Sequence, residues 1–283
     1  MKKETKKNSK KNVKRKIYLI ILLLFLVAFI LSSVQLGITL YRYRQADLLY
    51  NDLQNRFVTF VPQDPGHTSD NAGEPDPGKN PDDPSAQEPA VIVKAPIRVD
   101  FDALLQENGD VIGWLYCEDT PINYPVLRAD DNDYYLHRDL NGKYLFSGSL
   151  FVDYRCSPVG TGQNFIIYGH NMKNGSMFAV LSKYKEQSYY DEHPVLWYLT
   201  PNGDYRIDLF AGMVTSSKSD VYTPEFGADE VFGAFLQKIT EQSTFVSDVS
   251  VTTEDHIVTL STCSYEFGNA RYVIFGKLIG SSR

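Results

Sequence analysis

Residues 17–41 carry no charged side chain, and this uncharged apolar run limits what the chain can fold into more than any other feature. A helix of about 20 apolar residues can cross a bilayer core of about 30 Å. The preceding residues 1–16 contain nine Lys and Arg and one acid, Glu4. Because basic segments stay on the cytoplasmic side, we expect a cytoplasmic tail over 1–16, a single transmembrane anchor over 17–41, and an extracellular remainder.

A cleaved secretory signal is the competing interpretation of the apolar run. Such signals have an apolar region of about 7–15 residues, followed by a cleavage site built from small residues. The run over 17–41 is longer, and no convincing cleavage site follows it. An uncleaved anchor in the cell membrane is therefore favoured.

The charge of the exported part argues against one class of partner. The whole chain has 28 Lys and Arg against 35 Asp and Glu. Without the nine basic residues and one acid of the tail, the rest of the chain carries a net charge of −15. No nucleic-acid partner is expected, since nucleic-acid-binding proteins present basic surfaces to phosphate.

The chain after the anchor divides into three further segments. Apolar residues at three- and four-residue intervals predict a membrane-proximal helix over 42–61. Residues 62–90 are rich in Pro, Asp, Gly and Asn and nearly devoid of large apolar side chains, which predicts a disordered tether with a reach of about 30 Å. We expect the folded domain to occupy residues 91–283.

Short apolar runs separated by turn residues fill the folded domain. Eight such runs, a few helices and no regular alternation between them predict a mainly β fold, an antiparallel or mixed barrel. The expected strands are residues 113–117, 122–127, 149–153, 164–168, 195–200, 205–215, 256–262 and 272–279, and the expected helices are residues 101–108, 177–183 and 229–241.

The three cysteines are too few for a disulfide framework. The spacing of Cys117 and Cys156 allows a bridge, and two buried thiols are at least as compatible with it. Cys263 ends an apolar strand, and Arg271 comes just before the last one. A nearby cation favours the nucleophilic thiolate, and a fixed guanidinium can stabilise an oxyanion.

A catalytic cysteine usually works with a histidine, and His170 is the best placed. It follows the apolar strand 165–168 and opens a turn-forming loop. Rigid scaffolds tend to present functional groups at such exits from a strand. A histidine that merely caps a strand end fits the same pattern, so the residues alone leave both readings open.

The remaining histidines are weaker candidates. His67 lies in the predicted tether, and His193 precedes a proline in a polar turn that favours a solvated side chain. His256 opens the strand that leads to Cys263, so it is expected at the far end of that strand, about 23 Å away at about 3.3 Å per residue. His137 is a lesser candidate for the base.

Four motifs, in this order along the chain, resemble those of the class B sortases, membrane-anchored transpeptidases of Gram-positive bacteria. They are residues 131–136, 148–155 and 168–172, and residues 259–263 followed by Arg271. The resemblance covers the chain from about residue 100 to the end. It implies an eight-stranded sortase-type β-barrel with a few inserted helices and an active site in a groove on one face.

The resemblance also implies roles for six residues. Cys263 matches the family's nucleophile, His170 its general acid and base, and Arg271 its oxyanion-stabilising or substrate-orienting arginine. The expected substrate-binding residues are Asn132 and Leu136, which match the groove lining, and Ser264, whose backbone N–H is expected to be a second oxyanion donor.

The implied reaction joins a surface protein to the cell wall. The enzyme cleaves a C-terminal sorting signal after a threonine, forms a thioester with the protein, and transfers it to an amine acceptor of a peptidoglycan precursor or of a pilin. No cofactor is expected. No metal is expected either, because no Cys-x-x-Cys or His-x-x-x-His spacing occurs, and the acidic residues 130–133 fit a solvated turn and helix cap better than a calcium loop.

Two alternatives of other classes remain at this stage. A papain-like cell-wall peptidase or amidase would use the same Cys263 and His170 but would release its product to water. Such an enzyme is expected to have an Asn or Asp that orients the histidine, and Arg271 would be optional. In a non-catalytic anchored binding domain, Cys263 would be a buried thiol.

Overall fold

The computed structural model describes residues 2–61 and 94–281 of the chain. It divides into two compact units, Met1–Leu48 and Leu49–Arg283. The tether predicted over 62–90 lies outside the described residues.

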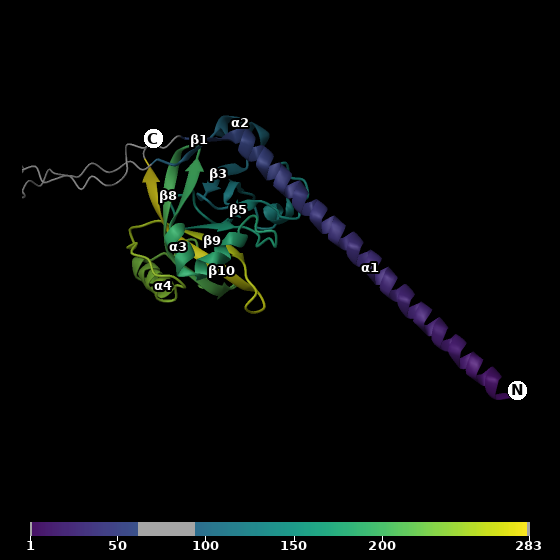
Figure 1. Ribbon diagram of the computed structural model, residues 1–283. Coiled ribbons are helices and arrows are strands. Elements are labelled where there is room, and N and C mark those ends of the chain that lie inside the picture. Colours follow the sequence, from purple (N-terminus) through teal and green to yellow (C-terminus); the bar gives the residue numbers. More distant parts are fainter. Residues whose placement is uncertain (1, 62–93, 282–283) are drawn as a thin grey trace, which may run out of the picture. The chain divides into compact units, whose positions relative to one another are not determined.

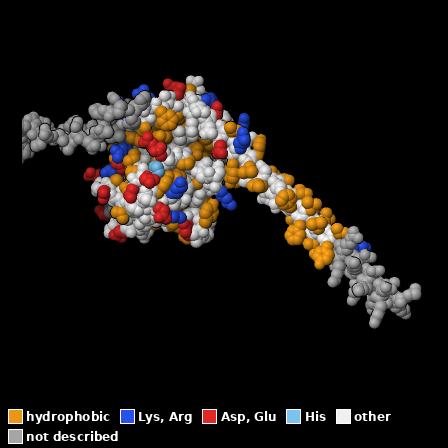
Figure 2. Space-filling model, in the orientation of Figure 1, with side chains coloured by type: hydrophobic (Ala, Val, Ile, Leu, Met, Phe, Trp, Pro, Cys, Tyr) orange, Lys and Arg blue, Asp and Glu red, His pale blue; other side chains and the backbone are white. Residues whose placement is uncertain are grey.

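The first unit belongs to one continuous helix, α1 (Lys2–Phe57). This helix contains the predicted anchor, and no part of its most apolar window is buried. Large apolar side chains are exposed along it from Tyr18 to Tyr41, and Figure 2 shows them as an orange run. Among the described residues it is the helix long and apolar enough to cross a membrane.

The second unit begins at Leu49, about forty residues before the predicted start of the domain. The last turns of α1 belong to it and bury Tyr50, Leu53 and Phe57. The Tyr50 hydroxyl donates to the carbonyl oxygen of Gly148, which lies in the barrel domain. The sequence did not predict that the second unit begins inside the helix, because the Pro- and Asp-rich stretch after it suggested a linker.

The predicted membrane-proximal helix ends at Phe57, and the next three residues form a strand instead. β1 (Val58–Phe60) pairs antiparallel with β2 (Ile97–Val99), so that Phe60 lies opposite Ile97. β-branched and aromatic residues such as these favour strands over helices. This pairing places Phe60 and Ile97, which flank the predicted tether, next to each other.

Eight strands close into a barrel, as predicted (Figure 1). Their order is β10-β8-β7-β3-β4-β5-β6-β9, and the barrel closes between β9 and β10. The pairs β4–β5 and β6–β9 are parallel, and the other pairs are antiparallel. The strands are β3 (Val111–Tyr116), β4 (Asn123–Leu127), β5 (Leu150–Val152), β6 (Asn164–Tyr168), β7 (Val195–Thr200), β8 (Gly203–Ser216), β9 (Ile257–Cys263) and β10 (Ala270–Ser281).

The barrel core is built from the apolar runs that predicted the strands. Trp114, Leu115, Ile166, Leu260 and Ile274 are fully buried. Burial of a large apolar side chain contributes about 1.5–3 kcal/mol. These runs are buried along most of their length because helices and loops cover the outer face as well.

The helices between the strands are short, apart from α4 (Asp229–Glu241), whose bounds are those predicted. α4 packs on β8 and buries four apolar side chains, whereas Val231 is exposed. The helix predicted over 177–183 starts two residues later, because Met177 has a φ of +56° that a right-handed helix does not admit. The others are α2 (Phe101–Glu107), α3 (Gln187–Glu192) and the 3₁₀ helices η1 (Tyr134–His137), η2 (Ala179–Lys185) and η3 (Asp220–Tyr222).

Candidate active site

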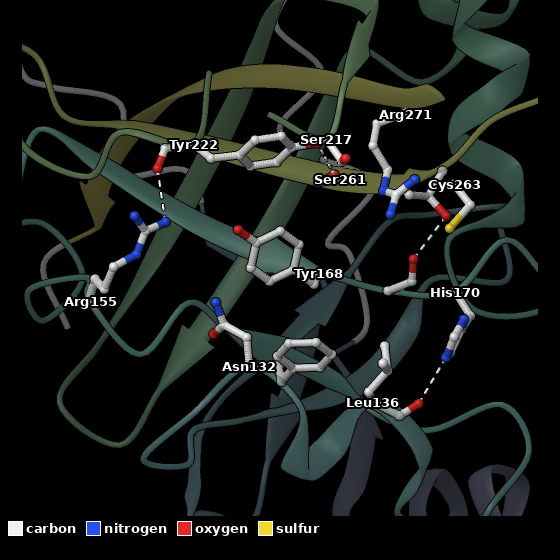
Figure 3. A pocket seen from close by; sticks show the side chains of 13 residues that line it. Asn132, Leu136, Arg155, Tyr168, His170, Ser217, Tyr222, Ser261, Cys263 and Arg271 are labelled. Carbon is white, nitrogen blue, oxygen red and sulfur yellow. Dashed lines mark hydrogen bonds between the residues drawn. The ribbon is translucent and has the colours of Figure 1, made fainter. Parts of the chain in front are cut away.

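A groove with a volume of about 370 Å³ opens where β6, β9 and β10 meet. In Figure 3, Cys263, His170 and Arg271 lie together on one side of this groove, and Arg155 lies on the opposite side. Its lining comes from several elements and consists of Asn132, Leu136, Phe151, Arg155, Tyr168, Gly169, His170, Ser217, Tyr222, Ser261, Thr262, Cys263 and Arg271.

Strand register brings the thiol and the guanidinium together. Cys263 ends β9, and the antiparallel register places Arg271 of β10 directly opposite it. Directly opposed residues have Cβ atoms about 4.5–5.5 Å apart on the same face. Arg271 Nη1 donates to the carbonyl oxygen of Ala270 at 3.0 Å. A guanidinium has five N–H donors, so one anchored in this way can present others to an oxyanion.

A second pairing delivers the histidine. β6 runs parallel to β9, with Tyr168 opposite Ser261. The carboxyl ends of parallel strands meet at one edge, so His170, two residues beyond Tyr168, arrives beside Cys263, two residues beyond Ser261. The sequence placed each residue at a strand end, but it did not show that these two ends are neighbours.

Hydrogen bonds on both sides of His170 hold it against β9. The carbonyl oxygen of Gly169 accepts from Thr262 Oγ1 at 2.8 Å. Asn171 Nδ2 donates to the carbonyl oxygen of Cys263 at 2.8 Å. The residues before and after the histidine are thus bonded to the end of the strand that bears the cysteine, which limits the relative movement of the two side chains.

The imidazole of His170 is half-buried and has one ring nitrogen engaged. Nε2 lies 2.8 Å from the carbonyl oxygen of Leu136. Because a carbonyl can only accept, Nε2 carries a proton, and Nδ1 lies on the side of Cys263 (Figure 3). Burial lowers the pKa of His170, and the positive charges of His137 and Arg271 lower it further, while the bond to Leu136 opposes them.

The two predicted groove residues line this pocket; Asn132 lies just before η1 and Leu136 lies within it. Leu136 contributes a side chain to the lining and the carbonyl that His170 contacts. Asn132 accepts from the backbone N–H of Tyr154 through Oδ1 at 3.1 Å. That bond turns the Nδ2 donor of Asn132 toward the groove (Figure 3).

The structure contradicts the role predicted for Ser264. Its backbone N–H donates to the carbonyl oxygen of Ala270 at 3.0 Å, within the β9–β10 connection, so it is not available to an oxyanion. The Ser264 hydroxyl donates to Glu266, which also pairs with Lys185. Ser264 is not among the residues that line the groove. The prediction that Ser264 N–H is a second oxyanion donor is therefore wrong.

Several lining residues were not predicted. At the far end, Arg155 makes two hydrogen bonds to the buried carboxylate of Asp153, at 2.9 and 2.7 Å, and Tyr168 Oη donates to it at 2.8 Å. Burial alone would raise the pKa of Asp153, but these hydrogen bonds outweigh burial and lower it. Tyr222 Oη lies 2.9 Å from Ser261 Oγ. The motif over 148–155 contained the signal for Arg155, but it did not reveal which way the side chain points.

The other cysteines differ from Cys263. Cys117 and Cys156 are free and buried rather than bridged, which settles the alternative that the spacing left open. Burial raises the pKa of each thiol to about 11. Cys263 is half-buried and lines the groove. Thiols with raised pKa values are inert toward electrophiles at neutral pH, so reactivity is expected at Cys263.

The other described histidines each pack against or hydrogen-bond to a neighbouring group. His137 ends η1 and stacks against His170. His193 is half-buried beside Tyr189 rather than solvated. His256 precedes β9, as expected, and hydrogen-bonds through Nδ1 to the carbonyl oxygen of Gly162. His67 lies outside the described residues.

Known proteins are similar to this chain in both sequence and fold. Residues 115–279 match the sequence profile of the family described as Sortase domain. Sortase B of Listeria monocytogenes is 40% identical over 189 residues, which cover 66% of this chain and 77% of that protein.

Solved structures agree with the sequence comparison. A Bacillus anthracis sortase B in complex with AAEK1 has a TM-score of 0.67 at 31% identity, and the match covers 85% of this chain and 99% of that one. A Staphylococcus aureus sortase B–substrate complex has a TM-score of 0.61 at 34% identity, and the match covers 64% of this chain and 85% of that one.

Proposed function

The chain belongs to the sortase family and is a cysteine transpeptidase of the sortase B type, and from that premise we propose that Cys263 is its nucleophile, His170 its general acid and base, and Arg271 its oxyanion donor. The observation that carries the proposal is the pair of strand pairings, β9 with β10 and β6 with β9, that bring these residues to one end of a groove.

The papain-like and non-catalytic alternatives do not fit a chain of this family. The histidine of a papain-like enzyme is oriented by an Asn or Asp side chain, whereas the ring of His170 hydrogen-bonds to the backbone carbonyl of Leu136. Cys263 is half-buried and faces the groove, so it is also not the buried thiol of a binding domain.

In the first half of the reaction, the Cys263 thiolate attacks the carbonyl carbon of a threonine residue in the sorting signal. The carbonyl oxygen becomes an oxyanion, which Arg271 stabilises with charge-assisted hydrogen bonds. The C–N bond then breaks, and the imidazolium of His170 gives its proton to the departing amine. A thioester between Cys263 and the threonine carbonyl remains.

In the second half, an acceptor amine attacks the thioester. His170, now neutral, takes the proton that the amine loses, the new C–N bond forms, and the C–S bond breaks. The thiolate and the imidazolium are regenerated together. No cofactor is needed, because each step uses only a thiol, an imidazole and a guanidinium.

The resting protonation state follows from the surroundings of His170. Because burial and nearby positive charge lower the pKa of His170, the neutral form of its imidazole dominates at pH 7. The imidazolium that accompanies the attacking thiolate is therefore a minor form of His170. The enzyme thus turns over through a small active fraction.

The sorting signal occupies the groove with its threonine at Cys263 and its preceding residues toward Asn132 and Tyr168. The groove supports this direction, because it runs from Cys263 toward Arg155 and is lined there by aromatic rings and by the amide of Asn132. A related structure, named as a sortase B–substrate complex, supports a substrate of this class. The amine acceptor is an amino group of a peptidoglycan precursor or of a pilin.

The enzyme works at the outer face of the cell membrane, with residues 1–16 in the cytoplasm and residues 17–41 as a single-pass anchor. The exposed apolar face of α1 and the nine basic residues before it support this arrangement. Confinement to the membrane surface raises the effective concentration of substrates that are themselves membrane-bound.

The function is tested with the full chain in detergent, a small set of fluorogenic pentapeptides of the sorting-signal type, and a short glycine peptide as the amine acceptor. We expect slow cleavage without acceptor, and a ligated product of the predicted mass when the acceptor is present. Cleavage that yields only the free acid at saturating acceptor would argue for a hydrolase, and no cleavage of any peptide would remove the proposed substrate class.

A further inference from the structure

One titratable side chain outside the three proposed catalytic residues contacts His170. His137, the last residue of η1, lies with its ring centroid 5.1 Å from that of His170 and its plane only 19° from parallel. Its ring also lies 6.3 Å from that of Tyr144. The imidazole of His170 is therefore packed under a second ring rather than standing free in the groove.

The same short segment fixes His170 in a second way. Leu136, the neighbour of His137, provides the carbonyl oxygen 2.8 Å from Nε2. A single hydrogen bond fixes the direction of one N–H but allows the ring to rotate about it. A stacked ring removes that rotation, so the two contacts from η1 together determine where Nδ1 points.

The titratable and charged groups that face His170 come from three elements. His137 approaches from η1 and Arg271 from β10, and each disfavours the imidazolium form, while the thiol of Cys263 approaches from the end of β9. Loss of the His137 ring would both hydrate His170 and remove a like charge. Both changes favour protonation, so His170 would titrate at a higher pH without its neighbour.

We propose that His137 is a positioning residue of this transpeptidase, whose stacked ring holds His170 at the angle that points Nδ1 toward Cys263 while Nε2 remains on Leu136. The proposal rests on the assignment of His170 as the general acid and base. His137 acts through His170 alone and transfers no proton. A ring of similar size without a titratable group therefore suffices at this position.

The test compares His137→Ala, which removes the ring, with His137→Phe, which keeps a stacking ring. His193→Ala is the matched control, since the ring of His193 also packs on a neighbouring ring, but on Tyr189, at 4.5 Å between centroids, rather than on His170. All are made in the full chain in detergent. The measurements are kcat and KM for a sorting-signal peptide across pH, and the titration of His170 by NMR.

We expect His137→Ala to lower kcat about ten- to a hundredfold with KM within about twofold, as loss of orientation of a catalytic group does. The His170 titration should move to higher pH. His137→Phe should retain most of kcat, and His193→Ala should match the parent chain in both readouts.

Three results would overturn the proposal. The first is a His137→Ala enzyme whose kcat and His170 titration match the parent, and the second is a His137→Phe enzyme as impaired as His137→Ala. The third is an effect confined to KM, which would make His137 a substrate contact. If the parent chain itself cleaves no sorting peptide, the proposed function fails instead, and the NMR titration of His170 still decides whether the stack exists.

Discussion

Arg271 and Cys263 face each other across one rung of the β9–β10 ladder, so the position of the guanidinium depends on the backbone rather than on a flexible loop. Because Ser264 N–H is bonded to the carbonyl oxygen of Ala270, the proposed mechanism relies more heavily on Arg271 to stabilise the oxyanion than the sequence suggested. Side chains held on strands keep their geometry better than those on loops.

Replacement of Arg271 by Ala should therefore lower kcat/KM about 10²–10³-fold, the usual cost of one oxyanion donor. Arg271→Lys should recover only part of this loss, since an ammonium keeps the charge but lacks the planar arrangement of donors. Steady-state kinetics with a sorting-signal peptide measure both variants. An Arg271→Ala enzyme within threefold of the parent would contradict the assignment.

The lowered pKa of His170 predicts the acid side of the pH profile. The active pair holds one proton shared between Cys263 and His170, and below the His170 pKa a second proton converts it to the inactive thiol–imidazolium form. Since the pKa of His170 lies below its ordinary value near 6.5, the acid limb of kcat/KM should have its midpoint below about 6.5. A midpoint above that value would show that the free enzyme holds His170 differently.

At the level of elements, η1 and the turn before β5 position His170, the proposed general acid and base. Gly148 has a φ of +55°, and a Cβ atom there would lie 2.2 Å from the carbonyl oxygen of Leu136, the group that His170 contacts. Only glycine meets both the left-handed backbone and this close approach. The glycine thus supports the site without lining it.

Gly148→Ala is expected to destabilise the fold by about 2 kcal/mol or more and to lower kcat, because the displaced Leu136 carbonyl no longer holds His170. Gly227→Ala is the control, since Gly227 also has a positive φ, +80°, but a Cβ there meets nothing within 4 Å. This variant should be destabilised by a similar backbone strain but should keep its kcat. Urea unfolding and steady-state kinetics separate the two effects, and equal kcat losses in both variants would refute the link to His170.

The elements themselves were predicted from the sequence more fully than their contacts. Alternating and continuous apolar runs gave all eight barrel strands to within about three residues at each end, because burial in a barrel is a local pattern of side chains. The strand β1 was missed, since three residues are too few to show a period and their partner, β2, lies beyond a long insertion.

The residues of the candidate site were likewise predicted more fully than their contacts. Cys263, His170 and Arg271 were each found at a strand end, and the family motifs joined them. The state of the Ser264 N–H, the stack of His137 on His170 and the direction of Arg155 depend on pairings between distant segments. No local pattern contains that information.

At the level of the whole molecule, the boundary of the catalytic unit falls inside α1 rather than after it. The end of this helix and β1 pack with the barrel, and the buried Leu53 and Phe57 each contribute about 1.5–3 kcal/mol. One continuous helix, Lys2–Phe57, therefore contains both the predicted anchor and the first residues of the second unit.

A chain that begins at residue 94 should therefore be several kcal/mol less stable than one that begins at Leu49, because it lacks these buried side chains and β1. The chain from Leu49 should unfold at a clearly higher urea concentration, with a larger m-value in proportion to its additional buried surface. Identical midpoints would show that residues 49–60 do not belong to the folded unit.

The central claim is that Cys263 carries the acyl group of the substrate. The most direct measurement is the intact mass of the full chain after incubation with a sorting-signal peptide in the absence of amine acceptor. We predict a mass increase equal to the acyl fragment that ends at threonine, mapped to Cys263, removed by hydroxylamine and absent from the Cys263→Ala variant. An adduct that persists in Cys263→Ala, or one that maps to Cys117 or Cys156, would contradict the account.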